Sequence, residues 1–405
     1  MKKTPLAALV SAEVISILGS RMTYLALPWF VLVTTGSVAK MTYVLAAEIL
    51  PMALLGIPSG MVVERLGARR TMLVCDAARF PLLAAIPLLH SADLLTFPLL
   101  LVLVFVLGCF MAPYFAAQRV ILPELVGEDE RTISQANSLI EGGTAIAGLA
   151  GPALAGVLIP FMSATNVLYV DAATYLVSFL LLAGFVPKTK RVVGAVASGG
   201  VLAGITFFVR DRLLAPLGAT VIALNFVGSS ISATIPFYAF DAFESSRIAG
   251  AFYTAGGAGA LVGSILAMMA VKRMAPLRMA GVGMIAATLP LWLLPLDLPA
   301  AGVMGALFLM MLFIPFVNGP LIGVITARTP VELRPKVMTA LVSVSTLSAP
   351  LGFLAAGQLL DAWAPTQVFA ATAAGMTATA LVFATIALRH RDEEAAPETP
   401  AVPAA

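Results

Sequence analysis

The feature that most constrains the fold is a series of long apolar runs that fills nearly the whole chain. A membrane-spanning helix needs about 20 mainly apolar residues. Runs of that kind occur twelve times, at residues 8–33, 41–61, 73–90, 97–117, 134–159, 166–186, 213–238, 248–270, 278–295, 300–325, 337–360 and 367–388. The pattern predicts an all-α integral membrane protein with twelve transmembrane helices.

The overall composition excludes several other classes of protein. The chain is 60% hydrophobic and 11% charged, whereas soluble domains carry about 25% charged residues. Its net charge of +3 comes with no basic stripe interleaved with aromatics, so we expect no nucleic-acid partner. Cys75 and Cys109 lie far apart in apolar runs, and His90 and His390 lie at a helix end and in the tail. We therefore expect no disulfide, no metal site and no cofactor.

The basic residues indicate the orientation of the chain. An even number of spans places both termini on one side, and Lys and Arg mark the loops that stay inside. In this arrangement twenty of the 24 basic residues fall on the side of the termini. Lys40 and Arg247 lie outside, and Arg21 and Arg79 lie within helices. The apolar run after residues 1–3 continues to Val33, too long for a signal peptide. We expect an N-in/C-in protein of the bacterial inner (plasma) membrane.

The longest connection on the inner side, at residues 187–200, lies halfway along the chain. It predicts two six-helix bundles, at residues 1–186 and 213–388, joined by a cytoplasmic linker and interfacial segment at 187–212. The polar and Pro/Ala-rich tail at 389–405 should be disordered. The sequence G-P-A-L-A-G at 151–156 is echoed by G-F-L-A-A-G at 352–357, which is 201 residues later. Duplicated halves around a midplane site are a common build of transporters.

A short charged turn separates the second and third apolar runs. Its arginines hold it inside, and Gly67 offers the positive φ that a tight reversal needs. A basic turn of any origin satisfies the charge rule, but the spacing G-x-x-x-E-R-x-G-x-R-R resembles the loop signature of the major facilitator superfamily. The resemblance implies a cytoplasmic gate formed by Gly60, Glu64, Arg65, Gly67, Arg69 and Arg70, with Arg79 of the next helix. The counterpart at 271–278 keeps the basic residues but lacks the acid and the glycine.

A second motif lies on the fifth apolar run, where Gly151, Pro152 and Gly156 form G-P-x-x-A-G. Small residues let helices pack closely in lipid, in this as in any membrane bundle. The motif resembles the glycine-proline signature of superfamily antiporters, with Ala155 in place of one glycine. Together with A-L-P-W at 26–29, A-N-S-L at 136–139 and V-D-A-A-T-Y at 170–175, it is similar to bacterial drug:proton antiporters of the macrolide-efflux and siderophore-exporter type. The arginine that many such exporters carry midway along helix four is absent from residues 98–116.

Charged residues within the spans are the strongest functional indicators. A charge at the bilayer centre costs about 2.5–3.5 kcal/mol on insertion scales, so it usually faces a cavity or a partner. The candidates for proton coupling are Glu13, Glu48, Glu141 and Asp76. Asp171, near the outer end of the sixth run, is interpreted as interfacial. Arg21 and Glu48 lie on neighbouring helices of a hairpin, where their pairing would either respond to protons or act as a static ion pair.

A central cavity is predicted from polar and aromatic residues at depth. We expect it to be lined by Arg21, Tyr24, Trp29, Phe30, Asn225, Phe226 and Asn318. Such a set suits a large, mostly apolar ligand with a few polar groups, although membrane aromatics also pack or face lipid. The sequence carries no P-loop, G-x-S-x-G or H-E-x-x-H motif, so it does not support ATP-driven transport or hydrolysis. We predict that the protein is not an enzyme.

The resemblance implies a secondary active transporter that works by alternating access and exports lipophilic drugs or metabolites in exchange for protons. Its partners would then be a small-molecule substrate, the proton and the lipid bilayer, and the family expectation is a monomer. One alternative with the same fold is an uptake permease or facilitator for a small polar solute. Another class is a non-transporting membrane sensor or assembly factor, which usually carries a soluble domain or long loops.

The first prediction concerns Glu48. Replacing Glu48 by Gln removes the titratable proton but keeps the size of the side chain, so pH-driven transport should be lost while folding is retained. The measurement is substrate flux in proteoliposomes under an imposed pH gradient. Unaltered proton dependence in Glu48→Gln would remove this residue from the coupling mechanism.

Overall fold

The computed structural model describes residues 3–126, 130–188, 201–330 and 333–389, and every regular element within these ranges is a helix. In chain order the elements are α1 (Lys3–Thr35), α2 (Val38–Leu66), α3 (Ala68–Ser91), α4 (Phe97–Cys109), α5 (Met111–Val126), α6 (Glu130–Phe185), α7 (Val201–Arg210), α8 (Leu214–Phe243), α9 (Ser246–Ala270), α10 (Pro276–Thr288), η1 (Leu289–Leu296), α11 (Ala300–Phe313), α12 (Pro315–Arg328), α13 (Arg334–Ala362) and α14 (Pro365–Arg389).

Within the described residues, eleven helices are long and apolar enough to cross a membrane. One of them, α6, has 56 residues, which at ~1.5 Å per residue is far longer than a bilayer is thick. Ser163, with φ 74° and ψ 156°, breaks α6 into two helices. The break falls between the fifth and sixth expected spans, so the predicted twelve-span helical fold is confirmed. The fourth, ninth and tenth spans are each built from two consecutive elements, namely α4 with α5, α10 with η1, and α11 with α12.

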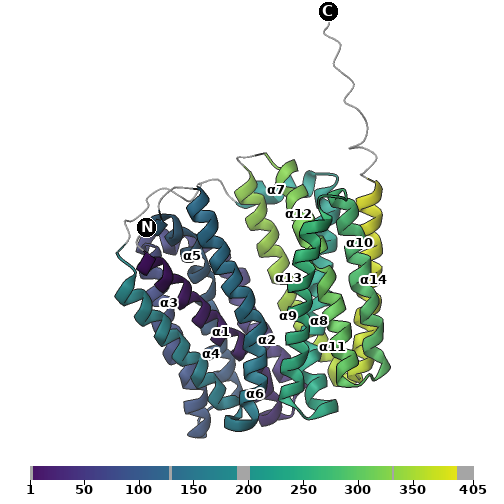
Figure 1. Cartoon of the computed structure of the whole chain (residues 1–405). Helices are drawn as coiled ribbons and strands as arrows, with labels where there is room; N and C mark the ends of the chain where they lie inside the picture. Colours follow the sequence, from purple (N-terminus) through teal and green to yellow (C-terminus); the bar gives the residue numbers. More distant parts are fainter. Residues whose placement is uncertain (1–2, 127–129, 189–200, 331–332, 390–405) are drawn as a thin grey trace, which may run out of the picture.

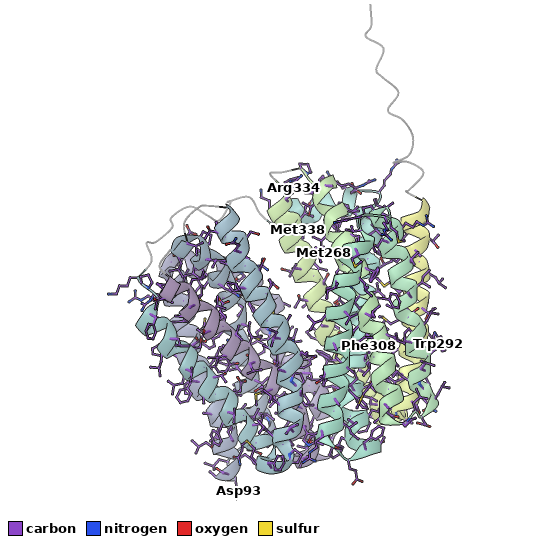
Figure 2. All side chains as sticks on the ribbon, in the orientation of Figure 1. Asp93, Met268, Trp292, Phe308, Arg334 and Met338 are labelled. Atoms are coloured by element: carbon purple, nitrogen blue, oxygen red, sulfur yellow. The ribbon has the colours of Figure 1, made fainter. Side chains whose placement is uncertain are left out.

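The helices form two groups that lie side by side (Figure 1). Helices α1–α6 make up one group, and α8–α14 make up the other. The groups meet at one end and separate toward the end where α1 begins and α14 finishes. Arg334 and Met338 of α13 lie at this terminal end, and Asp93 lies at the opposite end (Figure 2). We propose the domain bounds 1–186 and 213–388 for this arrangement. Of the expected linker and tail, residues 189–200 and 390–405 lie outside the described residues.

Glycines of the internal repeat make equivalent contacts in the two groups. A Cβ on Gly151 would meet Arg21 and the Leu18 carbonyl oxygen of α1, the first span. A Cβ on Gly352 would meet the Phe226 carbonyl oxygen of α8, the seventh span. Within each half, the small residue therefore lets one helix approach the backbone of the helix that opens that half.

The second glycine of each motif joins the two groups at the end away from the termini. A Cβ on Gly156 would lie 3.0 Å from the Gly250 Cα of α9, and the Ser246 hydroxyl donates a 3.2 Å hydrogen bond to the Gly156 carbonyl oxygen. On the other side, a Cβ on Gly357 of α13 would meet Thr42 of α2. Two pseudo-equivalent backbone contacts thus close this end of the molecule, which we call the closed end.

Close packing within the second group yields a stability prediction. A Cβ on Gly259 would collide with the backbone carbonyl of Phe308 in α11 (Figure 2), whereas a Cβ on Gly305 would meet nothing within 4 Å. We expect Gly259→Ala to destabilise the protein by about 1–3 kcal/mol through overpacking. The matched control Gly305→Ala should be neutral or slightly stabilising because Ala favours helix. Thermal unfolding in detergent measures both variants, and equal midpoints would contradict the contact.

Candidate functional site

A cavity of about 610 Å³ lies between the two groups of helices. Its volume is in the usual range for small-molecule sites, about 300–1,000 Å³. One half contributes residues of α1, α2, α3, α5 and α6, and the other half contributes residues of α8, α12 and α13. Because both halves form its wall, a movement of one half against the other changes the cavity itself.

The surface of the cavity wall is mainly apolar, although twelve of its 24 lining residues are polar or charged. Ile49, Met52, Leu321, Ile322 and Val342 are among its apolar residues. The polar and charged side chains are Ser16, Ser20, Arg21, Tyr24, Glu48, Arg79, Tyr114, Thr144, Asn225, Asn318, Ser345 and Thr346. Polar groups set into a mainly apolar surface can fix the orientation of a ligand that is itself mostly apolar.

Four of the predicted cavity residues line this space, namely Arg21, Tyr24, Asn225 and Asn318. Trp29 and Phe30 do not line it: both are buried, and they pack edge-on against Phe240 and His90 respectively.

Phe226 is 38% exposed and also lies outside the cavity wall. Successive residues of a helix point about 100° apart, so the helix that turns Asn225 toward the cavity turns Phe226 away. The three aromatic residues Trp29, Phe30 and Phe226 therefore do not line this cavity, because residue type alone does not give helix rotation.

Glu48 is the carboxylate of the central cavity. Its Oε2 atom is buried and has no hydrogen-bond partner. Arg21 lines the same cavity, but the described residues record no ion pair between the two side chains. The expected pairing is thus not formed in this conformation. A buried carboxylate oxygen without a partner is costly, and it is available to a proton or to a donor on a ligand.

The other predicted coupling residues occupy three different environments. Glu13 is fully buried outside the cavity wall and accepts a 2.8 Å hydrogen bond from the Gln118 amide. Asp76 is also fully buried and accepts a 2.7 Å hydrogen bond from the Ser178 hydroxyl. Glu141 is exposed on α6 and lines a second cavity.

Arg79 lies in the cavity wall, away from the arginine-rich loop with which the sequence analysis grouped it. It follows Arg70 by nine residues, about 13 Å along the helix axis. Its guanidinium carbon lies 4.4 Å from the ring centre of Tyr175 and 5.6 Å from that of Tyr114. Both distances are within the range of cation–π attraction. The geometry thus associates Arg79 with the ligand cavity and leaves its predicted role in the gate as a hypothesis.

Asp171 is fully buried, contrary to its interpretation as interfacial. Its carboxylate accepts hydrogen bonds from the hydroxyls of Thr23 and Thr174. Nearby, the Tyr175 hydroxyl lies 2.9 Å from the Ser20 hydroxyl. Sequence reasoning interpreted Asp171 as interfacial because it lies near the start of the expected span at 166–186, but nearness to a helix end does not show that the side chain turns inward toward Thr23 of α1. It also missed Tyr114, Gln118, Tyr175 and Ser178, of which only Tyr175 falls in a motif that the sequence analysis singled out, V-D-A-A-T-Y at 170–175.

The charges of the site belong to the first half. In the described cavity wall, the second half supplies neutral polar groups, namely the amides of Asn225 and Asn318 and the hydroxyls of Ser345 and Thr346. The first half supplies the charged groups of this wall, namely Arg21, Glu48 and Arg79. Any response of the cavity to protons therefore begins in the first half.

The predicted gate loop is a tight turn between α2 and α3. Gly67 has φ 82°, as expected from its position in the motif. Arg69 donates hydrogen bonds of 2.7 Å to the Val186 carbonyl and 2.8 Å to the Ala183 carbonyl, which ties the turn to the end of α6. Arg65 and Arg70 are exposed, whereas Gly60 and Glu64 are half-buried within α2.

The sequence of this chain is similar to those of known proteins. Residues 9–353 match the family model of the Major Facilitator Superfamily. The chain is 28% identical over 384 residues to "Multidrug efflux pump Tap" of Mycolicibacterium fortuitum. The aligned region covers 89% of this chain and 90% of that protein. It is 27% identical over 407 residues to the Tap pump of Mycobacterium tuberculosis (strain ATCC 25618 / H37Rv), covering 96% and 95%.

Solved structures show the same fold at low sequence identity. The nucleoside transporter NupG superposes with a TM-score of 0.80 at 13% identity, covering 94% of this chain and 99% of that one. A bacterial homologue of the human lysosomal transporter Spinster, described as inward-facing and unoccupied, gives a TM-score of 0.73 at 14% identity, covering 97% and 98%.

The buried network around Asp171 can be tested through one of its donors. In Thr23→Val the carboxylate loses a buried hydrogen bond, and we expect a destabilisation of about 1–3 kcal/mol. Thr34 lies on the same helix but is exposed, and its hydroxyl bonds only to backbone carbonyls of its own helix. Thr34→Val should therefore change stability by less than about 0.5 kcal/mol. Thermal unfolding of the two variants is the measurement, and a neutral Thr23→Val would refute the network.

Proposed function

The chain belongs to the major facilitator superfamily, and on this premise we propose that it exports lipophilic compounds across the bacterial inner membrane in exchange for protons. The observation that carries the proposal is the central cavity, which is mainly apolar, shared by both halves and holds one unpaired carboxylate. The name of the Tap relatives, multidrug efflux pump, favours export of this kind.

The arrangement of contacts supports alternating access. The halves touch at the closed end through Gly156 with Gly250 and through Gly357 with Thr42, while the cavity lies between them. In transporters built from repeats, one half rocks against the other around a fixed site. To open the closed end, both of these contacts have to separate. Of the antiporter-like residues, Pro152 and Gly156 would then act as a removable seal against Gly250, while Gly151 packs against α1 within the first half. The monomer would be the working unit.

The basic residues favour an inward-open state in the N-in/C-in orientation. Arg334 lies at the terminal end (Figure 2), as do the arginines of the turn between α2 and α3. Because positively charged loops stay in the cytoplasm, we propose that the terminal end is cytoplasmic. The tie from Arg69 to the end of α6 would hold the gate loop in this state.

Proton coupling is assigned to Glu48 within this scheme. Its unpaired oxygen faces a cavity in which Arg21 and Arg79 are the neighbouring cations. Protonation removes one negative charge from the cavity wall and leaves the two guanidinium groups without a counter-charge there. A cationic or hydrogen-bonding ligand would then compete with the proton for Glu48, which is the condition for exchange. Glu13, Asp76 and Asp171 form the buried polar network behind this wall.

The second candidate function is uptake of a polar solute. The amides of Asn225 and Asn318 in the cavity favour it, since they supply hydrogen bonds that a polar ligand needs. Transport direction separates the two functions: an exporter moves substrate against a proton flux, whereas a permease or facilitator moves it with the flux or without one.

The test measures transport under a pH gradient while a reversible disulfide holds the closed end shut. An ideal Cβ on Gly357 lies 3.1 Å from the Thr42 Cβ, close to the spacing of about 3.5–4.5 Å found in disulfides. With Cys75 and Cys109 replaced by Ser, oxidised Thr42→Cys/Gly357→Cys should transport no faster than protein-free liposomes. Macrolides, tetracyclines and lipophilic cationic dyes are assayed under an imposed pH gradient.

Reduction of the disulfide in the same sample should restore transport. In each single-cysteine variant the oxidant should leave the transport rate unchanged. Transport that continues after complete cross-linking would refute alternating access through the closed end. Transport that does not depend on the pH gradient would indicate facilitated movement of the substrate and not exchange for protons.

A further inference from the structure

The wall of the central cavity contains one acidic and two basic side chains, and each comes from a different helix. Glu48 belongs to α2, Arg21 to α1 and Arg79 to α3. Both arginines act electrostatically on Glu48, as does Asp171 from behind the wall. The described residues nevertheless record no ion pair between Glu48 and either arginine. Opposite charges that share a cavity without pairing are available to a ligand that carries both signs.

Arg79 is the less available of the two cations. Only 4% of its surface is exposed, and its guanidinium lies against the rings of Tyr175 and Tyr114. The buried carboxylates of Asp76 and Asp171 also act on it electrostatically. The positive charge of Arg79 is therefore offset by groups of the protein itself.

Arg21, in contrast, is exposed although it lies near the middle of α1. A guanidinium at that depth usually faces a cavity or a partner, and the described part of the chain records no hydrogen bond or ion pair for it. Glu141 lines the second cavity together with Arg21. It lies ten residues before Gly151, where α6 packs against Arg21. Because ten residues span about 15 Å of helix, Glu141 does not supply the missing anion.

Glu48 supplies the complementary group. Its Oε2 atom is buried and has no partner, and hydrogen bonds from charged donors to a carboxylate are the strong ones. On the opposite half, the Asn225 amide nitrogen donates a 3.0 Å hydrogen bond to the Val221 carbonyl of its own helix. The Asn225 oxygen is then left to accept from a ligand. The wall thus provides acceptors for an ammonium group as well as a guanidinium for an acid group.

We propose that the central cavity selects zwitterionic amphiphiles, with the ammonium group of the substrate on Glu48 and its acid group on Arg21. The inference rests on the proposed export function and names the substrate class of that site. The apolar part of the substrate lies against side chains such as Ile49, Met52 and Leu321. The two charges of the ligand replace the ion pair that the protein leaves unformed.

A ligand with a single charge leaves one of the two protein charges uncompensated. A cation pairs with Glu48 but adds positive charge beside Arg21, whereas an anion pairs with Arg21 but adds negative charge beside Glu48. Charges removed from water are costly to leave unpaired, and the loss of one charge-assisted hydrogen bond weakens binding about tenfold or more. Since the ammonium group occupies the same oxygen as a coupling proton, substrate and proton still exclude each other.

Four derivatives of ω-aminooctanoic acid test the proposal because they differ in charge on a common chain. The free amino acid is a zwitterion, its methyl ester a cation, its N-acetyl derivative an anion and its N-acetyl methyl ester neutral. The flexible chain lets both charged ends reach the protein groups. Binding to the full-length protein in nanodiscs is measured by isothermal titration calorimetry, at a pH where the amine is protonated and the carboxyl group ionised. The zwitterion should bind about tenfold more tightly than each of the other three.

Charge-neutralising variants assign the two ends of the ligand. Arg21→Gln should weaken binding of the zwitterion about tenfold and leave that of the methyl ester unchanged. Glu48→Gln should weaken binding of the zwitterion by a similar factor and leave that of the N-acetyl derivative unchanged. The matched controls Arg247→Gln and Glu244→Gln remove exposed charges around the turn between α8 and α9, outside the cavity wall. Both controls should bind all four compounds as the parent protein does.

Tighter binding of the methyl ester than of the zwitterion would overturn the proposal in favour of a cation site. Tighter binding of the N-acetyl derivative would overturn it in favour of an anion site. Equal affinity for all four compounds, or no binding of any, would also overturn it, as would equal losses for all compounds in Arg21→Gln or Glu48→Gln. No transport enters this measurement. Failure of the protein to exchange substrate for protons in proteoliposomes would therefore count against the proposed export and leave the binding result standing.

Discussion

The structure depends on the contact between the two halves at the closed end. Gly156 meets Gly250 and Gly357 meets Thr42, in each case with too little space for a larger side chain. Lipid offers no hydrophobic gain for pressing helices together, so such contacts are stabilised by close packing and by hydrogen bonds such as that from Ser246 to the Gly156 carbonyl. Contacts of this kind hold the halves firmly at one end and can still separate without exposing charge.

The two halves contribute different chemistry to the cavity they share. The first half brings Glu48, Arg21 and Arg79, supported by buried carboxylates that each accept a hydrogen bond from a neighbouring side chain. The described wall of the second half brings amides and hydroxyls. The two halves of a duplicated fold can carry different functional groups, because the repeat fixes how the helices pack and leaves the side chains of the cavity wall free to differ.

Particular residues show how far sequence reasoning reached. Gly67 was expected at positive φ from its place in a charged turn, and its φ is 82°. The repeat of residues 151–156 at 352–357 correctly paired two sets of helix contacts. Asp171 was interpreted as interfacial from its place near a helix end, whereas the rotation of that helix turns its carboxylate toward Thr23 of α1. Trp29, Phe30 and Phe226 were assigned to the cavity by residue type, whereas helix rotation directs them elsewhere.

The sequence by itself determined that the chain crosses a membrane as twelve helices, because apolar length and the scarcity of charge leave no other solvent for those residues. It also determined the family, through motifs that depend on local geometry such as a tight turn. Only the tertiary structure decided which charged and polar groups meet, and that Asp76 and Asp171 each accept a side-chain hydrogen bond while Glu48 has a buried oxygen without a partner. These outcomes depend on helix rotation and on the positions of helix breaks, which arise from packing between residues far apart in the chain.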